Sequence, residues 1–138
     1  MTTPKRTGVC KLTGRHGQFV KSHLIPAALT RPESKGAFLV QAGLGERPIK
    51  RWTSWYDPAL VTAEGEKILA AHDSAGIAEL SRHKLIWSSW GPMLELNTSD
   101  LKRYAWGIGV RRLQNVDGHT LRIFFLSLLW RNAQPRPY

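Results

Sequence analysis

The chain has 138 residues, and its 20 lysines and arginines against 10 aspartates and glutamates give a formal net charge of +10 with histidine counted as neutral. This length predicts one domain with a real hydrophobic core, and the 42% hydrophobic and 22% charged residues exclude a disordered tail and a membrane protein. The beginning of the sequence lacks the apolar stretch of a secretory signal, so we expect a cytoplasmic protein with no membrane partner.

The first fifty residues are predicted to be rich in turns. Three glycines in residues 1–26 favour a loop or tight hairpin, with Cys10 near its start. Pro26 can then open a short helix or turn. Residues 31–50 carry two prolines and three glycines, which predicts a loop with one small strand at 37–40.

The middle of the chain is predicted to contain a strand followed by a helix. Residues 49–56 are β-prone and predict one strand. Asp57 followed by Pro58 is typical of an N-cap and a first helical residue. The helix that follows is expected to be interrupted at Gly65 and to end near residues 72–76.

The last third is predicted as a strand, a short helix and a long helix. Residues 83–90 favour a strand, and capping groups in 97–100 favour a helix at 101–105. A turn is expected at 115–118. The apolar residues between 121 and 129 recur at the spacing of an amphipathic helix, which is the strongest periodic signal in the chain.

The positive charge makes nucleic acid the first partner to consider, with DNA favoured over RNA, because a basic surface attracts polyanions and releases counterions from phosphates. The plainer alternative is a basic soluble protein with no polyanion partner. The candidate contact residues are Lys21, Lys50, Arg51, Arg82, Lys84, Arg111, Arg112 and Arg131.

The single cysteine, Cys10, cannot form an internal disulfide and cannot alone hold a structural zinc, which needs about four nitrogen or sulfur ligands. The histidines other than His23 show no spacing that is typical of metal ligands. Because the core must then be held by packing, we expect the six tryptophans to supply much of it. Four of them neighbour basic residues, and the more specific alternative for these four is that they stack on nucleic-acid bases. These four are Trp52, Trp55, Trp87 and Trp90.

Two stretches resemble the HNH-type, treble-clef nuclease-like proteins. The family opens with C-x-x-C-G followed by S-H-[IL]-I-P. This sequence has Cys10 and Gly14, with Thr13 in place of the second cysteine, and the run Ser22 to Pro26 fits throughout. The family continues with C-x-x-C-E and a later Asp. Here the second cysteine pair is replaced, Glu66 and Asp73 remain, and the end of the chain resembles the family's apolar helix before Leu-Trp-Arg. The replacements are Thr62 and Gly65, so three of the four knuckle cysteines are missing.

This resemblance implies an α+β fold: a small treble-clef-like β-hairpin and helix followed by a C-terminal amphipathic helix, as one domain over residues 1–133 with a frayed tail at 134–138. A structural zinc can contribute about 10 kcal/mol to such small domains. With the zinc ligands lost, no metal is expected for folding, and aromatic packing has to offset its absence.

In active relatives the histidine at the position of His23 is the general base toward water, and Mg²⁺ or Mn²⁺ stabilises the departing oxyanion. The resemblance leaves Glu66 and Asp73 as candidate metal ligands, about 10 Å apart if they share one helix. The alternative roles are structural: a hydrogen-bonded tether for His23, and a dipole partner and a helix-end cap for the two acids.

Three hypotheses follow. The first is a basic protein that binds nucleic acid on a zinc-depleted HNH-like fold, with cleavage reduced or absent. The second is an active metal-dependent endonuclease that uses His23. The third is a small phage or mobile-element protein that binds and inhibits a protein partner. We favour the first because it accounts for both the basic charge and the lost ligands.

Overall fold

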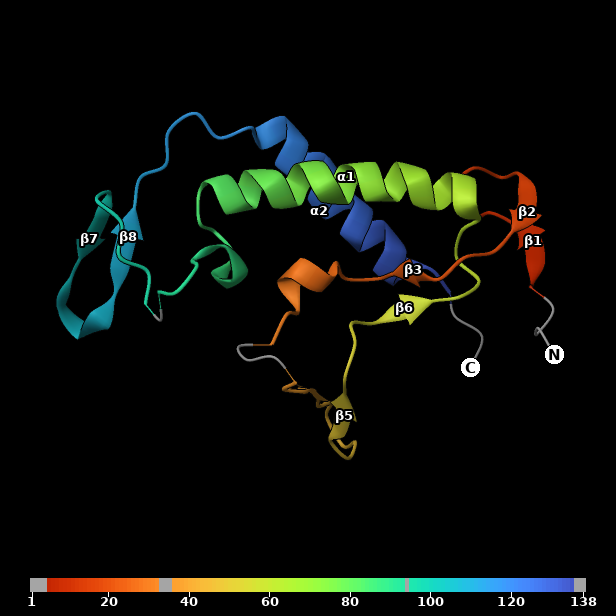
Figure 1. Cartoon of the computed structure of the whole chain (residues 1–138), viewed down its shortest axis with the longest axis horizontal. Coiled ribbons are helices and arrows are strands. Elements are labelled where there is room, and N and C mark those ends of the chain that lie inside the picture. Colours follow the sequence, from red (N-terminus) through yellow and green to blue (C-terminus); the bar gives the residue numbers. More distant parts are fainter. Residues whose placement is uncertain (1–4, 33–35, 94, 136–138) are drawn as a thin grey trace.

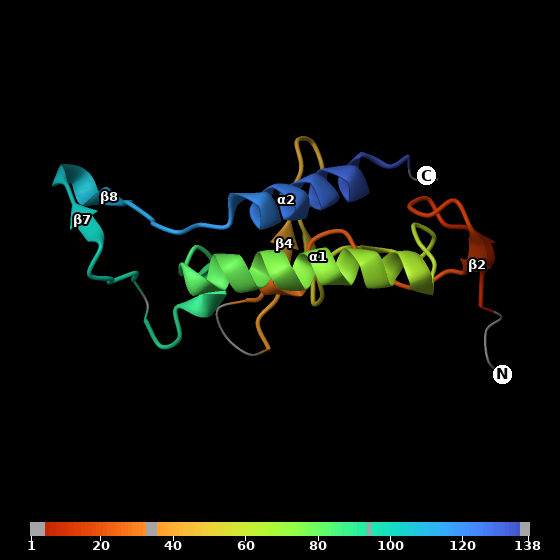
Figure 2. The ribbon, with the colours of Figure 1, turned by 90° about the horizontal axis from the view of Figure 1, so that it is seen from above.

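A computed structural model describes residues 5–32, 36–93 and 95–135. Within these residues, two α-helices and four two-stranded antiparallel sheets confirm the predicted α+β class. Helices α1 (Ala63–Arg82) and α2 (Gly118–Ala133) cross at the centre of an elongated molecule. One small sheet stands at each end of the long axis, as Figures 1 and 2 show.

The predicted N-terminal hairpin is present. Strand β1 (Thr7–Val9) pairs with β2 (His16–Gln18), and Gly8 lies opposite Gly17. The turn between them is closed by two backbone hydrogen bonds: Cys10 N donates to Arg15 O at 2.8 Å, and Gly14 N donates to Cys10 O at 2.9 Å. Gly14 has a φ of +70°, a conformation that glycine adopts without steric cost.

The predicted strand at 49–56 is divided between two sheets. Strand β5 (Ile49–Arg51) pairs with β4 (Leu39–Gln41), whereas β6 (Tyr56–Asp57) pairs with β3 (Ser22–His23). Ser54 explains the division, because its hydroxyl is turned inward and donates to Ile25 O at 2.6 Å. The chain therefore bends between the two strands. The expected short helix after Pro26 is the 3₁₀ turn η1 (Ala27–Leu29).

Helix α1 begins later and ends later than predicted. Asp57 does not cap a helix, since its Oδ1 accepts from Ala59 N at 2.8 Å in a tight turn that precedes the buried pair Leu60 and Val61. The helix starts after Thr62, continues through Gly65 without a break and reaches Arg82. Packing against α2 carries it past the predicted end at 72–76.

Helix α2 confirms that the residues predicted as an amphipathic helix are helical, and Asp117 caps the helix by accepting from Thr120 N at 3.0 Å. Phe124 is fully buried at the crossing with α1, where Gly76 leaves space for its ring. Phe125 and Leu129, expected inside, lie on the surface. Among the described residues, no helix combines the length and the apolar character needed to cross a bilayer.

The segment between the helices differs from the prediction. Residues 83–90 form no strand, because Lys84 adopts a φ of +52° and turns the chain into the 3₁₀ helix η2 (Trp87–Ser89). Residues 101–105 form no helix. They begin a hairpin in which β7 (Leu101–Arg103) pairs with β8 (Gly109–Arg111) around the 3₁₀ turn η3 (Ala105–Gly107).

The core is mainly aliphatic, which corrects the expectation of a core built on tryptophans. None of the six indoles is fully buried, and Trp55 and Trp130 pack against the edge of the core. Trp52, Trp87 and Trp106 are exposed. The buried clusters are Cys10, Leu24, Leu60, Val61 and Leu69, and then Leu80, Ile86 and Phe124. Of the predicted tail, residues 136–138 lie outside the described residues.

Candidate functional site

His23 lies on the short strand β3, opposite Tyr56 of β6. Its neighbour Ser22 is fully buried, while the His23 side chain is half-buried and lines a cavity of about 290 Å³. Because strand residues alternate between two faces, burial of Ser22 turns His23 toward the cavity. The imidazole is thus at the wall of a solvent-connected space.

Two arginines line the same cavity, Arg31 from the loop after η1 and Arg51 from the end of β5. Arg51 Nε donates to Gln41 Oε1, and its guanidinium carbon lies 5.4 Å from the Trp55 ring centroid. Arg31 is exposed and makes no hydrogen bond or ion pair with any residue that the structure describes. One guanidinium is therefore held in place, and the other has no partner among the residues that the structure describes.

The other polar lining residues are Thr30, Thr53, Ser54 and Trp52, and the rest of the lining is apolar. The Ser54 hydroxyl is already used in its bond to Ile25 O. No aspartate or glutamate is among the described lining residues. Two guanidinium groups and an imidazole favour an anion with several acceptor oxygens, such as a phosphate.

A larger cavity of about 850 Å³ adjoins the first. The two share Arg31, Pro32, Ala37 and Leu39 in their walls, so together they form one groove. We call it the basic–aromatic groove, because the first half carries the two arginines and His23, and the second half is lined by large apolar, mostly aromatic side chains. These are Phe38, Trp87, Trp90 and Met93.

The aromatic half of the groove is held by polar contacts at its edges. Trp90 Nε1 donates to Lys84 O at 3.1 Å, and Lys50 Nζ lies 4.5 Å from the Phe38 ring centroid. Trp87 is 40% exposed. Exposed aromatic faces beside cations can stack on bases and contact their phosphates. The groove thus combines phosphate-binding and base-stacking groups.

The two candidate metal ligands do not reach this groove. Both lie on α1, and the carboxylate of Asp73 is paired with Arg131, whose Nη1 donates to Asp73 Oδ2 at 2.9 Å. Glu66 has one buried carboxylate oxygen without a hydrogen-bond partner in the described part of the chain. Across residues 5–32, 36–93 and 95–135 there is no cluster of three His, Cys, Asp or Glu side chains. The described side chains thus bring neither Glu66 nor Asp73 to the imidazole of His23.

Arg131 was predicted to contact nucleic acid, and this is corrected. Its side chain is only 1% exposed, and besides Asp73 it donates to His23 O at 2.9 Å and to Ser127 Oγ at 3.0 Å. Both terminal nitrogens of this buried guanidinium are engaged, and its Nε is buried without a partner among the described residues, so the group is not available to a phosphate. It instead ties α2 to α1 and to the backbone of β3 behind the groove.

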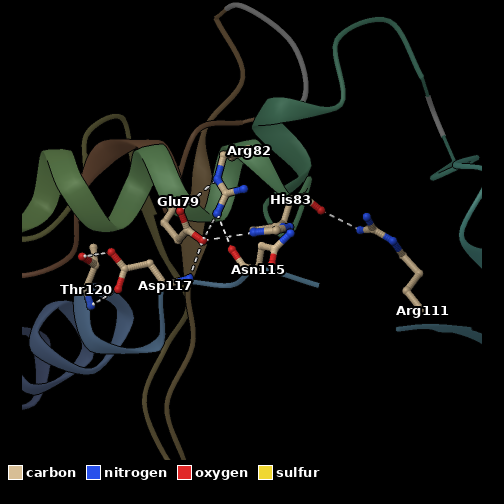
Figure 3. Close-up of polar contacts among 7 residues, drawn as sticks. All are labelled: Glu79, Arg82, His83, Arg111, Asn115, Asp117 and Thr120. Atoms are coloured by element: carbon tan, nitrogen blue, oxygen red, sulfur yellow. Dashed lines mark hydrogen bonds and ion pairs between the residues drawn. The ribbon is translucent and has the colours of Figure 1, made fainter. Parts of the chain in front are cut away.

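Two other predicted contact residues, Arg82 and Arg111, belong to a cluster that joins the end of α1 to the start of α2 and to the β7–β8 hairpin (Figure 3). Arg82 donates to both oxygens of Glu79 at 2.6 and 3.1 Å. Arg111 donates to His83 O at 2.7 Å. Lys84, which follows the cluster along the chain, donates to Ser89 O at 3.3 Å. These three cations therefore make structural contacts within the chain.

Glu79 is the centre of that cluster. Besides Arg82, it accepts from Asp117 N at 2.8 Å and contacts His83 Nε2 at 3.0 Å. The hydrogen bonds from Arg82 and from the Asp117 amide hold the pKa of Glu79 below its usual value. The carboxylate therefore stays charged and fixes the end of α1 against the start of α2, which Figure 3 shows.

The remaining predicted cations lie on the surface. Lys50 and Arg51 border the groove as described, and Lys21 Nζ lies 3.7 Å from the Tyr56 ring centroid beside β6. Arg112 is exposed at the end of the β7–β8 hairpin. Sequence reasoning missed Arg31. No pattern around it could have revealed it, because its place beside His23 depends on the fold of the loop.

Cys10 lies at the meeting point of the hairpin and the first turn of α1. Burial raises its pKa, but hydrogen bonds from Thr13 and from Thr62 outweigh this effect and lower the pKa to about 7. A Cβ on Gly65 would lie only 2.6 Å from Cys10 Sγ. Three uncharged residues therefore surround one thiol, a donor set that does not fit a tetrahedral zinc ion.

Comparisons with protein-family models, with curated proteins and with solved structures found no match for this chain. Its function is therefore inferred from the groove and from the residues around it.

Proposed function

We propose that this chain binds nucleic acid, DNA rather than RNA, as a basic, zinc-depleted HNH-like domain in which cleavage is reduced or absent. The observation that carries the proposal is the basic–aromatic groove. It places Arg31, Arg51 and His23 at one end, and the exposed Trp87 and the half-buried Trp90 at the other. Together with the net charge of +10, this arrangement suits a strand of phosphates with bases attached.

The HNH-like part of the proposal is supported by where four residues meet. Cys10, Thr13, Thr62 and Gly65 are the positions that the family pattern gives to the knuckle cysteines, and all of them lie around the Cys10 thiol. Residues that are 55 apart in the sequence come together here. This convergence is the arrangement that a pattern of four zinc ligands requires.

Binding is favoured over cleavage by the chemistry of the groove. A hydrolytic site that uses a divalent metal needs oxygen ligands beside the base, and the described walls of the groove offer guanidinium groups and hydroxyls instead. Arginine pairs well with a bound phosphate in a bidentate way. His23 then serves as a further contact to the backbone of the nucleic acid.

The first prediction concerns the groove arginines. Replacing both in an Arg31→Gln/Arg51→Gln variant is expected to weaken binding to a short DNA duplex and to flatten its salt dependence. The logarithmic slope should fall by about two, because each lost phosphate contact contributes about 0.9. Fluorescence anisotropy at several salt concentrations measures both effects, with an RNA duplex as the second substrate.

A matched control removes the same charge elsewhere. Arg15 and Arg122 are exposed and lie outside the walls of the groove. An Arg15→Gln/Arg122→Gln variant should change the slope much less. Equal losses in the two double variants would mean that binding follows net charge alone, and the groove would then lose its assigned role.

Cleavage is tested in the same preparation. Supercoiled plasmid with Mg²⁺, with Mn²⁺ or with chelator should be retarded on a gel and not nicked. Metal-dependent nicking that disappears in His23→Ala would establish the nuclease instead. Neither retardation nor nicking would move the function to a protein partner.

The second prediction tests the zinc-depleted description. A Thr13→Cys/Thr62→Cys/Gly65→Cys variant surrounds Cys10 with three further thiols. It is expected to bind one Zn²⁺ or Co²⁺ per chain, because four thiolates that meet at one point form a tetrahedral site. Visible absorption of thiolate-bound Co²⁺ is the readout. The unchanged chain is the control, and a triple variant without stoichiometric Co²⁺ absorption would contradict the HNH-like assignment.

A further inference from the structure

A two-stranded hairpin projects from the helices at the end of the molecule farthest from β1 and β2 (Figures 1 and 2). It consists of β7, the turn η3 and β8, and we call it the β7–β8 arm. Its side chains are unusually exposed for apolar residues: Tyr104, Ile108 and Val110 are 52–60% exposed, and Trp106 is 96% exposed. The arm therefore contributes little to the core.

The tip of the arm forces Trp106 outward. Trp106 and Gly107 both have a φ of +70°, and Tyr104 N donates to Ile108 O at 2.8 Å across the turn. A bulky residue in the left-handed region is strained, and such outliers gather at functional sites. The large aromatic ring of Trp106 is therefore held in solvent at the turn of the arm, at the opposite end from the part of the arm that contacts α1.

The base of the arm is anchored to α1. Arg111 Nη1 donates to His83 O at 2.7 Å, and Arg111 Nε lies 3.1 Å from both oxygens of Asp100. The Arg111 side chain is only 14% exposed. The contact with His83, which Figure 3 shows, holds the base of the arm to the end of the helix.

The arm carries only positive charge. Residues 101–116 contain four cations and no aspartate or glutamate. Lys102 and Arg112 are exposed and make no hydrogen bond or ion pair with the described residues, whereas Arg103 donates to Leu96 O at 3.4 Å and lies 3.9 Å from a carboxylate oxygen of Glu95. An exposed aromatic wedge between exposed cations is complementary to a polyanion with a stacked apolar interior.

We propose that the β7–β8 arm is a second DNA contact, in which the ribbon lies in a groove of duplex DNA and the Trp106 indole is inserted between base pairs. Lys102, Arg103 and Arg112 then contact the flanking phosphates. A two-stranded ribbon fits a groove of duplex DNA, and apolar wedges unstack base steps in this way. The inference rests on the proposed function and assigns a duplex as its ligand.

The test uses the full chain and a DNA duplex that carries 2-aminopurine, a base whose fluorescence rises when it is unstacked. The unchanged chain should bind and raise the fluorescence. Trp106→Ala should lose the fluorescence rise and bind about 10-fold more weakly, the effect of losing one stacked aromatic contact. Its salt slope should stay unchanged, whereas Lys102→Gln/Arg112→Gln should lower the slope by about two.

Two controls separate a wedge from a fold defect. Trp106→Phe keeps an aromatic ring and should retain part of the fluorescence rise. Leu129→Ala removes another exposed apolar side chain, 67% exposed, from α2 and should change neither readout. Because Trp106 is almost fully exposed, the thermal unfolding midpoint of Trp106→Ala should match that of the unchanged chain.

The outcomes are distinguishable. Salt-dependent binding by the unchanged chain with no effect of Trp106→Ala would overturn the arm inference and leave the proposed function standing. No binding by the unchanged chain would overturn both. If Trp106→Ala left DNA binding intact and converted a dimer into a monomer in sedimentation, the arm would be a contact between copies of the chain, and the inference would again be wrong.

Discussion

Replacing Asp73 with alanine is expected to lower the free energy of unfolding by about 3–5 kcal/mol, because it leaves the charge of Arg131 buried without a partner. Arg131 is 1% exposed and crosses from α2 to Asp73 of α1 and to the backbone of His23. Urea unfolding followed by circular dichroism measures the loss, provided that the slope of the unfolding free energy with urea is unchanged.

A surface ion pair supplies the control for this prediction. Glu64 accepts from Arg15 at 2.6 Å, but their side chains are 51% and 73% exposed. Glu64→Ala should therefore cost at most about 1 kcal/mol. An Asp73→Ala variant as stable as Glu64→Ala would show that Arg131 reaches solvent, and the groove would then lose the support behind His23.

The second large effect is expected at the crossing of the two helices. A Cβ on Gly76 would lie 2.3 Å from Cγ of the fully buried Phe124 ring. Alanine improves helix propensity by about 1 kcal/mol over glycine, but overpacking of this kind costs about 1–3 kcal/mol or more. Gly76→Ala should therefore be less stable than the unchanged chain, measured as a lower thermal unfolding midpoint.

Gly118 is the matched position, because it is the first residue of α2 and nothing lies within 4 Å of a Cβ built there. Gly118→Ala should be neutral or stabilising by up to about 1 kcal/mol. Combining Gly76→Ala with Phe124→Leu should restore part of the lost stability, since the two side chains share one space. Additive losses in the double variant would contradict a direct clash.

Local sequence signals were sufficient to predict the N-terminal hairpin and helix α2. The N-terminal hairpin follows from its glycines, and α2 follows from apolar spacing that survives even though Phe125 and Leu129 point outward. The start of α1 was misplaced, because Asp57 and Pro58 offer the same cap chemistry to a tight turn as to a helix. Nothing local distinguishes the two.

The parts that could not be predicted depend on long-range contacts. The local sequence around Arg131 is that of a surface cation. Its burial depends on pairing with Asp73, which is 58 residues away. The tryptophans were assigned to the core by size, but the crossing of α1 and α2 is closed by Gly76 and Phe124 instead. The groove was likewise hidden, since its walls come from separate loops.

The buried thiol offers a way to time the opening of this fold. The sequence holds one cysteine, and its side chain is 0% exposed where the hairpin meets α1. A thiol reagent therefore reacts only with molecules in which this junction has opened, so the labelling rate is a clock for local unfolding. Because Cys10 stays protected in the closed state, a new surface cysteine on the arm could carry a fluorescent label without competition from it.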